Sequence, residues 1–221
     1  MTEAVHHGLA SAVAATRGRL TRWLLPSGVD AGAWFILVGR ALRGFCDGYI
    51  AVLLPAYLLA LGLTQWAVGL VSSATLIGSA LATILVGMLG SRFAPRRLLM
   101  LAAALMAATG VGFAGLSDLW PLLAIAFVGT LNPSSGDVSV FLPLEQARLA
   151  ESALPDARTA LFARYSLIGA FSAAIGALAA ALPGWLATHS GLSFLAAMRA
   201  MFFVYALIGV ALWVLYARLP L

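Results

Sequence analysis

Six long apolar stretches fill most of this 221-residue chain, and they limit its fold more than any other feature. A helix needs roughly 20 mainly apolar residues to cross about 30 Å of hydrocarbon. Apolar residues make up 62% of the sequence and charged residues only 10%, whereas soluble domains have about 45–50% and about 25%. Backbone groups in lipid must be satisfied within the element that carries them. The sequence therefore predicts an all-α, polytopic membrane protein with six transmembrane helices.

The predicted spans divide the chain into two parts. They cover residues 34–61, 66–90, 98–116, 120–146, 160–182 and 194–217. Residues 33–221 therefore form a six-helix bundle, whose short connections favour antiparallel packing of neighbouring helices. Residues 1–32 place a basic cluster directly before a full-length span, which indicates an uncleaved first helix rather than a signal peptide. Within this N-terminal segment, residues 8–24 are interpreted either as a helix lying on the membrane surface or as a disordered basic tail.

The distribution of arginines predicts the topology. The formal net charge is +5, and the chain contains arginine but no lysine. The arginines fall beside the spans and are not gathered on one soluble surface, so nucleic-acid binding is a poor explanation. Those in the connections after the second and fourth spans and at the C-terminus are Arg92, Arg96, Arg97, Arg148, Arg158 and Arg218. The positive-inside rule then predicts that both termini are cytoplasmic.

Cofactor and disulfide chemistry have no sequence signature here. Cys46 is the single cysteine, so a disulfide framework within the chain is excluded. Walker and Rossmann phosphate-binding patterns are absent, as is a cluster of metal-ligand residues. We expect no cofactor and no direct use of ATP by this chain.

The turn between the second and third apolar stretches carries a specific motif. It reads GMLGSRFAPRR from Gly87 to Arg97. This turn resembles the loop that major facilitator superfamily transporters carry between their second and third helices, which is close to Gly-x-Leu-Ala-Asp-Arg-x-Gly-Arg-Arg. The residues that support the resemblance are Gly87, Leu89, Arg92, Arg96 and Arg97. Ser91 stands where the family usually has Asp, and Ala94 stands where it has Gly; a serine can cap the following turn but brings no charge.

The resemblance implies a fold and an activity. Six helices with cytoplasmic termini look like the amino-terminal half of a major facilitator, in which two six-helix halves hold the substrate at their interface near the midplane. The resemblance implies secondary, proton-coupled transport of a small solute across a bacterial inner membrane. It also implies that a second six-helix half, either a copy of this chain or a separate chain, completes the cavity. Gly87, Ser91, Arg92, Arg96 and Arg97 then belong to the gating loop.

Three ionisable residues lie inside the first span. Insertion of each costs about 2.5–3.5 kcal/mol, so Arg40, Arg43 and Asp47 are candidates for the cavity and for coupling. Arg43 and Asp47 are four residues apart and can pair on one helix face. Such a pair is interpreted in two ways: as an internal salt bridge that fixes helix register, or as a proton site in which Arg43 modulates Asp47.

The fourth span carries the second group of polar candidates, Asn132 and Asp137. Pro133 lies between them and cannot donate to the carbonyl of Gly129, so the helix is predicted to kink or break. Counted from the helix ends, Asp137 falls at nearly the depth of Arg43. The resemblance brings the first and fourth helices to the same cavity, which makes Arg43–Asp137 an alternative to Arg43–Asp47.

Further polar and small residues are assigned structural roles. Glu145 is predicted to pair with Arg164 near the cytoplasmic side. Small residues four apart favour close helix packing in lipid, and these are Gly69 with Ser73, Gly78 with Ala82, Gly169 with Ala173, and Gly176 with Ala180. Aromatic residues near span ends are predicted to anchor at the membrane interface, and these are Trp66, Trp120, Tyr165 and Trp185.

Two other classes of protein remain as alternatives. A non-transporting membrane subunit, or an inactive truncated remnant, is consistent with the half-size bundle and the missing loop Asp. An intramembrane protease of the rhomboid type is a remote alternative, because Ser135-Gly136 gives a partial match to its nucleophile motif. The only histidine near the sixth span is His189, outside the span, where a general base is badly placed.

Overall fold

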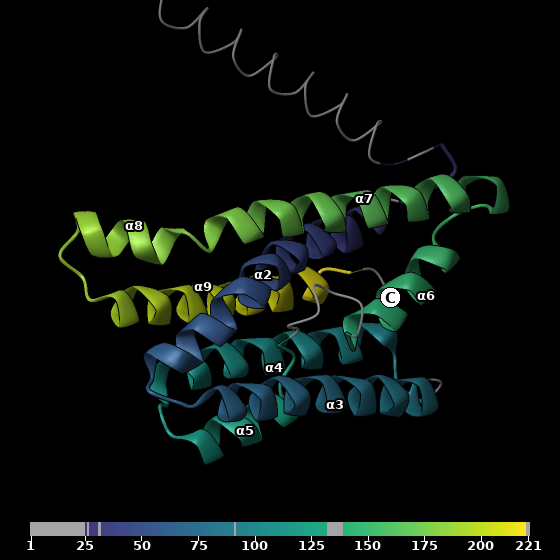
Figure 1. Ribbon diagram of the computed structural model, residues 1–221. Helices are drawn as coiled ribbons and strands as arrows, with labels where there is room; N and C mark the ends of the chain where they lie inside the picture. Colours follow the sequence, from purple (N-terminus) through teal and green to yellow (C-terminus); the bar gives the residue numbers. More distant parts are fainter. Residues whose placement is uncertain (1–24, 26, 31, 91, 132–138, 220–221) are drawn as a thin grey trace, which may run out of the picture.

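The computed structural model describes residues 25, 27–30, 32–90, 92–131 and 139–219, and these residues are helical apart from short connections (Figure 1). The helices in chain order are α2 (Ala33–Ala60), α3 (Gln65–Leu89), α4 (Pro95–Gly115), α5 (Leu119–Val128), α6 (Phe141–Glu151), α7 (Pro155–Ala179), α8 (Leu182–His189) and α9 (Phe194–Ala217). The all-α fold predicted from the sequence is confirmed. The segment 8–24, for which a surface helix was one interpretation, lies outside the described residues.

Helix starts follow ordinary capping chemistry. The side chain of Thr64 accepts a hydrogen bond from the backbone N–H of Ala67 (3.3 Å) at the start of α3. Ser193 does the same for Ala196 (3.2 Å) at the start of α9. Proline occupies the first turn of α4 and α7, where its missing N–H costs nothing. These local signals set where the apolar segments begin as helices.

The fourth predicted span is not one helix. Among the described residues, five helical segments are long and apolar enough to cross a membrane, and α5 is too short to be one of them. Six spans are therefore not confirmed. The predicted interruption of the fourth span is confirmed for the described residues, because α5 ends at Val128 and α6 begins at Phe141. The end of α5 at Val128 agrees with the interruption that the sequence predicts around Pro133.

The most extensive helix contacts join α2 with α7, α4 with α9, and α3 with α5. Gly44 faces the backbone of Gly169, and Gly48 faces the backbone of Ala173. Because a later residue of α2 faces a later residue of α7, the two helices run parallel. An antiparallel β-bridge between Val29 and Ala153 also places the starts of these two helices at the same end.

The parallel α2–α7 pair differs from the antiparallel neighbours expected from short connections. Helices that follow one another in the chain run antiparallel, but the closest packing partners here are far apart in sequence. The α4–α9 pair is antiparallel, since Gly110 meets the Phe202–Ala206 turn while Gly209 meets Ala107. Small residues decide these contacts, because two helices can approach closely only where Cβ atoms are absent or small.

Most of the predicted packing glycines have that role. A Cβ on Gly78 would overlap the backbone of Phe127, and a Cβ on Gly176 would overlap the backbone of Phe45. Gly169 faces α2, so it also lies at a close helix contact. Gly69 is the exception: no atom lies within 4 Å of its added Cβ, so its predicted role in packing is wrong.

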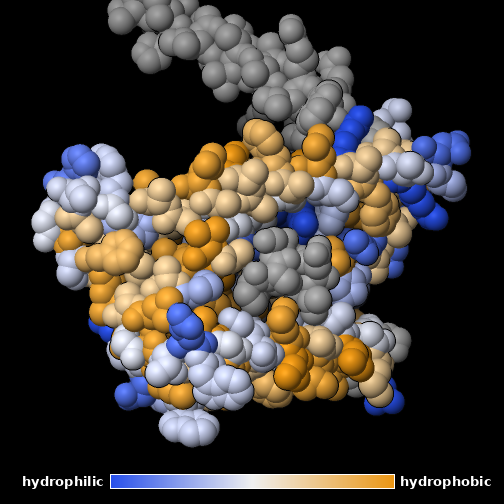
Figure 2. Space-filling view, viewed as in Figure 1, coloured by the Kyte–Doolittle hydropathy of each residue, from blue (hydrophilic) through white to orange (hydrophobic). Residues whose placement is uncertain are grey.

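Much of the surface is apolar, as is required where a surface faces lipid. Figure 2 shows apolar side chains along much of the visible face, and many leucines and phenylalanines of α3, α7 and α9 are exposed. Trp66, Trp120 and Trp185 are exposed near helix starts, consistent with their predicted interfacial positions. Tyr165 is only 2% exposed, so its prediction as a surface anchor is wrong.

Candidate functional site

A buried ion pair joins α2 to α6. The Nη2 atom of Arg43 lies 2.5 Å from Oε2 of Glu145, and the two side chains are 3% and 0% exposed. The sequence predicted Asp47 or Asp137 as the partner of Arg43, and Arg164 as the partner of Glu145. The Arg43–Asp47 and Glu145–Arg164 pairings are wrong, since Arg43 and Glu145 bind each other across 102 positions of the chain. The Arg43–Asp137 pairing stays a prediction, because Asp137 lies outside the described residues.

Two tyrosines complete the surroundings of Glu145. The hydroxyl of Tyr216 on α9 donates to Oε1 (2.5 Å), and the hydroxyl of Tyr165 on α7 donates to Oε2 (2.6 Å). Both carboxylate oxygens are therefore occupied by donors, as a buried charge requires. Gly39 makes this geometry possible, because a Cβ there would lie 2.5 Å from the Tyr216 hydroxyl.

Arg43 is held from other sides as well. Its guanidinium carbon lies 4.5 Å from the centre of the Phe141 ring, a cation–π arrangement. Its Nη1 donates to the Ser139 hydroxyl at 3.5 Å. We call Arg43, Glu145, Tyr165 and Tyr216 the buried network; it links α2, α6, α7 and α9.

Asp47 has no such partner among the residues that the structure describes. It lies one turn beyond Arg43 on α2, is 6% exposed, and its Oδ2 is buried without a hydrogen-bond partner. The expected Arg43–Asp47 pair does not form because the Arg43 guanidinium is turned to Glu145. Asn132 and Asp137, the other predicted candidates, lie outside the described residues.

Arg40 lies next to the buried network but does not share its hydrogen bonds. Its guanidinium carbon is 5.1 Å from the centre of the Tyr165 ring. Gly169 leaves the space for it, since a Cβ there would overlap the guanidinium. The Nε and Nη1 atoms of Arg40 are buried with no hydrogen-bond partner, as is Nη1 of Arg164. Buried donors without partners are costly, so these groups are the unsatisfied part of the site.

The residues of the predicted gating loop have different surroundings in the structure. Arg96 donates to the carbonyl of Ala217 and so holds the C-terminal end of α9. Gly87 and Arg92 are exposed, and Arg97 is exposed and lines a cavity between α3 and α4. Ser91 lies outside the described residues; the N-cap of α4 is Ala94, which provides no side-chain hydrogen bond.

Sequence reasoning missed the two tyrosines and the true partner of Arg43. A tyrosine hydroxyl inside an apolar span needs a hydrogen-bond partner, and this was the available signal for Tyr165 and Tyr216. The protease interpretation is not supported by position: His189 is exposed at the end of α8, where its Nδ1 lies 2.9 Å from the carbonyl of Trp185. Ser135 and Gly136 lie outside the described residues.

Comparison with known proteins agrees with this helical arrangement. The model of the Major Facilitator Superfamily matches residues 36–220, so the chain belongs to this superfamily. It is also similar to the uncharacterized membrane protein YJR124C of Saccharomyces cerevisiae, with 28% identity over 167 residues. That match covers 75% of this chain and 37% of the yeast protein. The chain therefore spans less than half the length of this relative.

Proposed function

We propose that the chain is a proton-coupled secondary transporter of a small solute, or the amino-terminal half of one. Its superfamily consists of secondary transporters, and nothing about the substrate follows from that membership. The observation that supports coupling is Asp47: a carboxylate 6% exposed inside an apolar helix, with one oxygen unpartnered. A side chain left in that state can bind and release a proton without breaking another contact.

The buried network indicates that Arg43 has a structural role, which differs from the role proposed for Asp47 and Arg40. Arg43 is already neutralised by Glu145 at 2.5 Å, so its charge is committed to structure. Asp47 and Arg40 are left with unpartnered buried atoms and are the residues proposed to face solute and proton. Intramembrane ionisable groups are functional candidates by default because their insertion is costly.

The experiment is a flux measurement on reconstituted protein. Metabolite profiles of cells with and without the chain identify a transported solute, and proteoliposomes containing a pH-sensitive dye then report proton movement when that solute is added. Asp47→Asn is expected to reduce solute-driven proton movement at least tenfold, with an unchanged amount of protein in the membrane. Asp118→Asn, at the exposed start of α5, is the matched control. Full coupling in Asp47→Asn rejects the proposal.

We also propose that a second six-helix unit is needed. Support comes from the two spans with the fewest buried residues. In the most apolar stretch of α3 28% of the residues are buried within the chain, and in that of α7–α8 17% are. Figure 1 has α7 along one side of the bundle and α3 along another. The partner is a second copy or a separate half, and crosslinking in membranes separates the two: a homodimer supports the first, a heterologous complex the second.

The proposed topology has six crossings with both termini in the cytoplasm. In this topology α5 and α6 belong to the fourth crossing. Support comes from the arginines around the α3–α4 connection and the α6–α7 connection, which lie on one side of the predicted spans. A bacterial inner membrane stays a prediction, since the relative described above is a yeast protein.

A second candidate function is a non-transporting membrane subunit. The observation that favours it is Arg96, whose side chain is bound to the α9 carbonyl of Ala217 and is not available to a moving gate. In that case no solute produces flux with the chain alone or with a second copy. The transport assay therefore distinguishes the two candidates directly.

A further inference from the structure

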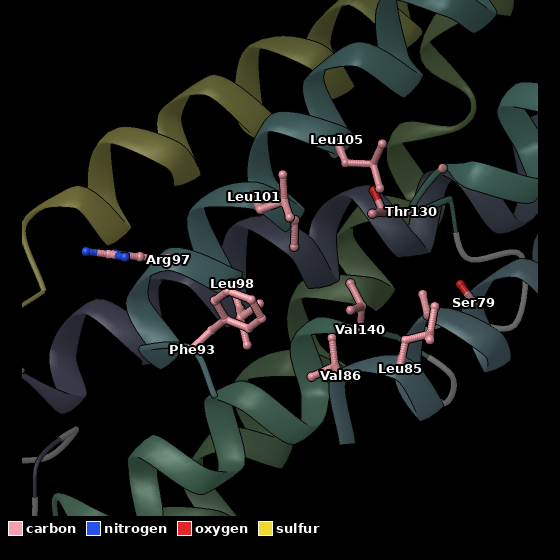
Figure 3. Close-up of a pocket in the computed structure, with 13 residues that line it drawn as sticks. Ser79, Leu85, Val86, Phe93, Arg97, Leu98, Leu101, Leu105, Thr130 and Val140 are labelled. Atoms are coloured by element: carbon pink, nitrogen blue, oxygen red, sulfur yellow. The ribbon is translucent and has the colours of Figure 1, made fainter. Parts of the chain in front are cut away.

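An apolar groove runs between α3 and α4, apart from the buried network. It has a volume of about 390 Å³, within the range of small-molecule sites. Figure 3 shows leucine side chains of both helices and Val86 of α3 around it, with Phe93 of the α3–α4 connection beside Leu98. Gly129, Thr130 and Val140, which flank the break of the fourth span, also line it.

The groove exists because two neighbouring helices have different packing partners. α3 packs on α5 through Gly78, and α4 packs on α9 through Gly110. α5 ends at Val128, so beyond that residue no α5 turn fills the space between α3 and α4.

The groove opens outward to the surroundings of the bundle. Leu85 is 54% and Leu101 66% exposed, and Phe93 is 50% exposed at one end. In a membrane protein such an opening meets acyl chains. From Arg97 to Leu105 the groove follows α4 for about 12 Å at 1.5 Å per residue, which is close to half of the roughly 30 Å of hydrocarbon.

Charge is confined to one end of the groove. Arg97 is the only ionisable residue among those lining it, and no hydrogen bond or ion pair of its side chain occurs within the described part of the chain. In Figure 3 its guanidinium lies at the edge of the group and points away from the leucines. An occupant with an apolar chain and an anionic head matches this distribution.

We propose that the groove binds one acyl chain of an anionic phospholipid, with the phosphate at Arg97. The polar head stays at the membrane surface, and the chain lies between Val86 and Leu98 and ends near Leu105. A lipid in this place substitutes for the missing helix contact between α3 and α4. A purely apolar occupant leaves Arg97 without a counter-charge, and a polar solute leaves the leucines without a partner.

The test is lipid retention by the full chain in nanodiscs of phosphatidylcholine with or without phosphatidylglycerol, followed by native mass spectrometry. The wild type is expected to retain one phosphatidylglycerol. Ala82→Phe, which fills the groove from α3, is expected to lose it at least tenfold. Ala80→Phe lies two residues away on an exposed face and is expected to retain it. Equal loss in both variants, or no retained lipid in the wild type, overturns the proposal.

A second pair of variants tests the head-group contact. Arg97→Gln is expected to lower the preference for phosphatidylglycerol over phosphatidylcholine about fivefold, the effect of one basic residue at a lipid surface. Arg92→Gln, exposed in the same connection but not lining the groove, is the control. An unchanged preference in Arg97→Gln contradicts the phosphate contact.

A measurement on the wild type avoids any folding defect. Phosphatidylglycerol with a photoreactive group on its acyl chain is expected to crosslink to the residue ranges 82–86 and 98–105. Crosslinks spread evenly over the exposed faces of α3, α7 and α9 indicate ordinary bilayer contact and overturn the proposal.

Discussion

The contact around Arg43 and the contact between α4 and α9 stabilise the same bundle by different means. At Arg43, four helices meet through one ion pair and two tyrosine hydroxyls, all buried. Between α4 and α9, Gly110 and Gly209 let two backbones approach closely, and the rings of Phe113 and Phe202 stack with centres 5.5 Å apart. The first contact depends on charge neutrality and the second on shape.

This difference predicts different responses to mutation. In lipid the apolar effect does not favour one helix neighbour over another, so packing and hydrogen bonds decide association. Loss of one partner from the buried network leaves a charge in a poorly solvated place. Loss of fit between α4 and α9 separates two helices without creating any charge.

The largest effect is expected from Glu145→Gln. It leaves Arg43 buried without a counter-charge, and removal of one partner of a buried pair costs about 3–5 kcal/mol. Reversible unfolding in mixed micelles measures this loss. Glu151→Gln is the matched control, because Glu151 pairs with Arg148 on the surface with 62% of its side chain exposed, where such pairs contribute about 0–1 kcal/mol. Equal effects of the two variants contradict a structural role for the buried pair.

Gly209→Val is expected to destabilise by up to about 3 kcal/mol, the upper range for overpacking. A Cβ at Gly209 would lie 2.6 Å from the backbone nitrogen of Ala107, which cannot move aside as a side chain can. The same unfolding measurement applies. Gly69→Val, where the added Cβ meets nothing within 4 Å, is expected to change stability by less than about 0.5 kcal/mol. A neutral Gly209→Val shows that α4 and α9 are not held by close approach.

Tyr216→Phe is expected to cost about 2 kcal/mol, since hydrogen bonds to charged groups contribute about 1.5–3 kcal/mol. The lost bond is the 2.5 Å contact from the tyrosine hydroxyl to Oε1 of Glu145. If the Glu145→Gln background removes most of this cost, the two residues act as one unit, which a double-mutant cycle measures directly. Full additivity contradicts the network.

Tyr57→Phe is expected to have the smallest effect, about 1 kcal/mol or less, as for hydrogen bonds between neutral groups. The hydroxyl of Tyr57 donates to the backbone carbonyl of Phe113 at 2.5 Å, and its ring packs on Phe202 at 4.6 Å. The ring contact is retained in the variant. A loss equal to that of Tyr216→Phe removes the distinction between the charged and the apolar contact.

Much of the fold was predictable from local patterns. The apolar stretches, the capping residue Thr64 and the proline at the start of α4 locate helices without any knowledge of tertiary contacts. Pro133 predicted the interruption of the fourth span because its effect on the carbonyl of Gly129 is local. The pattern did not predict that α5 ends at Val128 and that α6 begins at Phe141.

The candidate site was predictable only in part. Arg40, Arg43 and Asp47 were recognisable because charge inside an apolar span is costly. Their partners were not, because the i,i+4 rule favours Asp47 for Arg43 within one helix, whereas the structure offers Glu145 on another helix with two tyrosine donors already bound to it. A fully hydrogen-bonded carboxylate is the better partner for a buried guanidinium. Which carboxylate has these hydrogen bonds is decided by the tertiary structure.

The sequence by itself determined that the chain enters lipid, where its helices begin, and that the turn from Gly87 to Arg97 resembles a major facilitator loop. These properties depend on residues within a few positions of one another. Only the tertiary structure decided that α2 lies parallel to α7, that Glu145 neutralises Arg43, and that Asp47 is left unpaired. The physical reason is distance along the chain. Helix partners are selected by close approach of small residues and by charge satisfaction, and both join residues of different helices, beyond the reach of local sequence patterns.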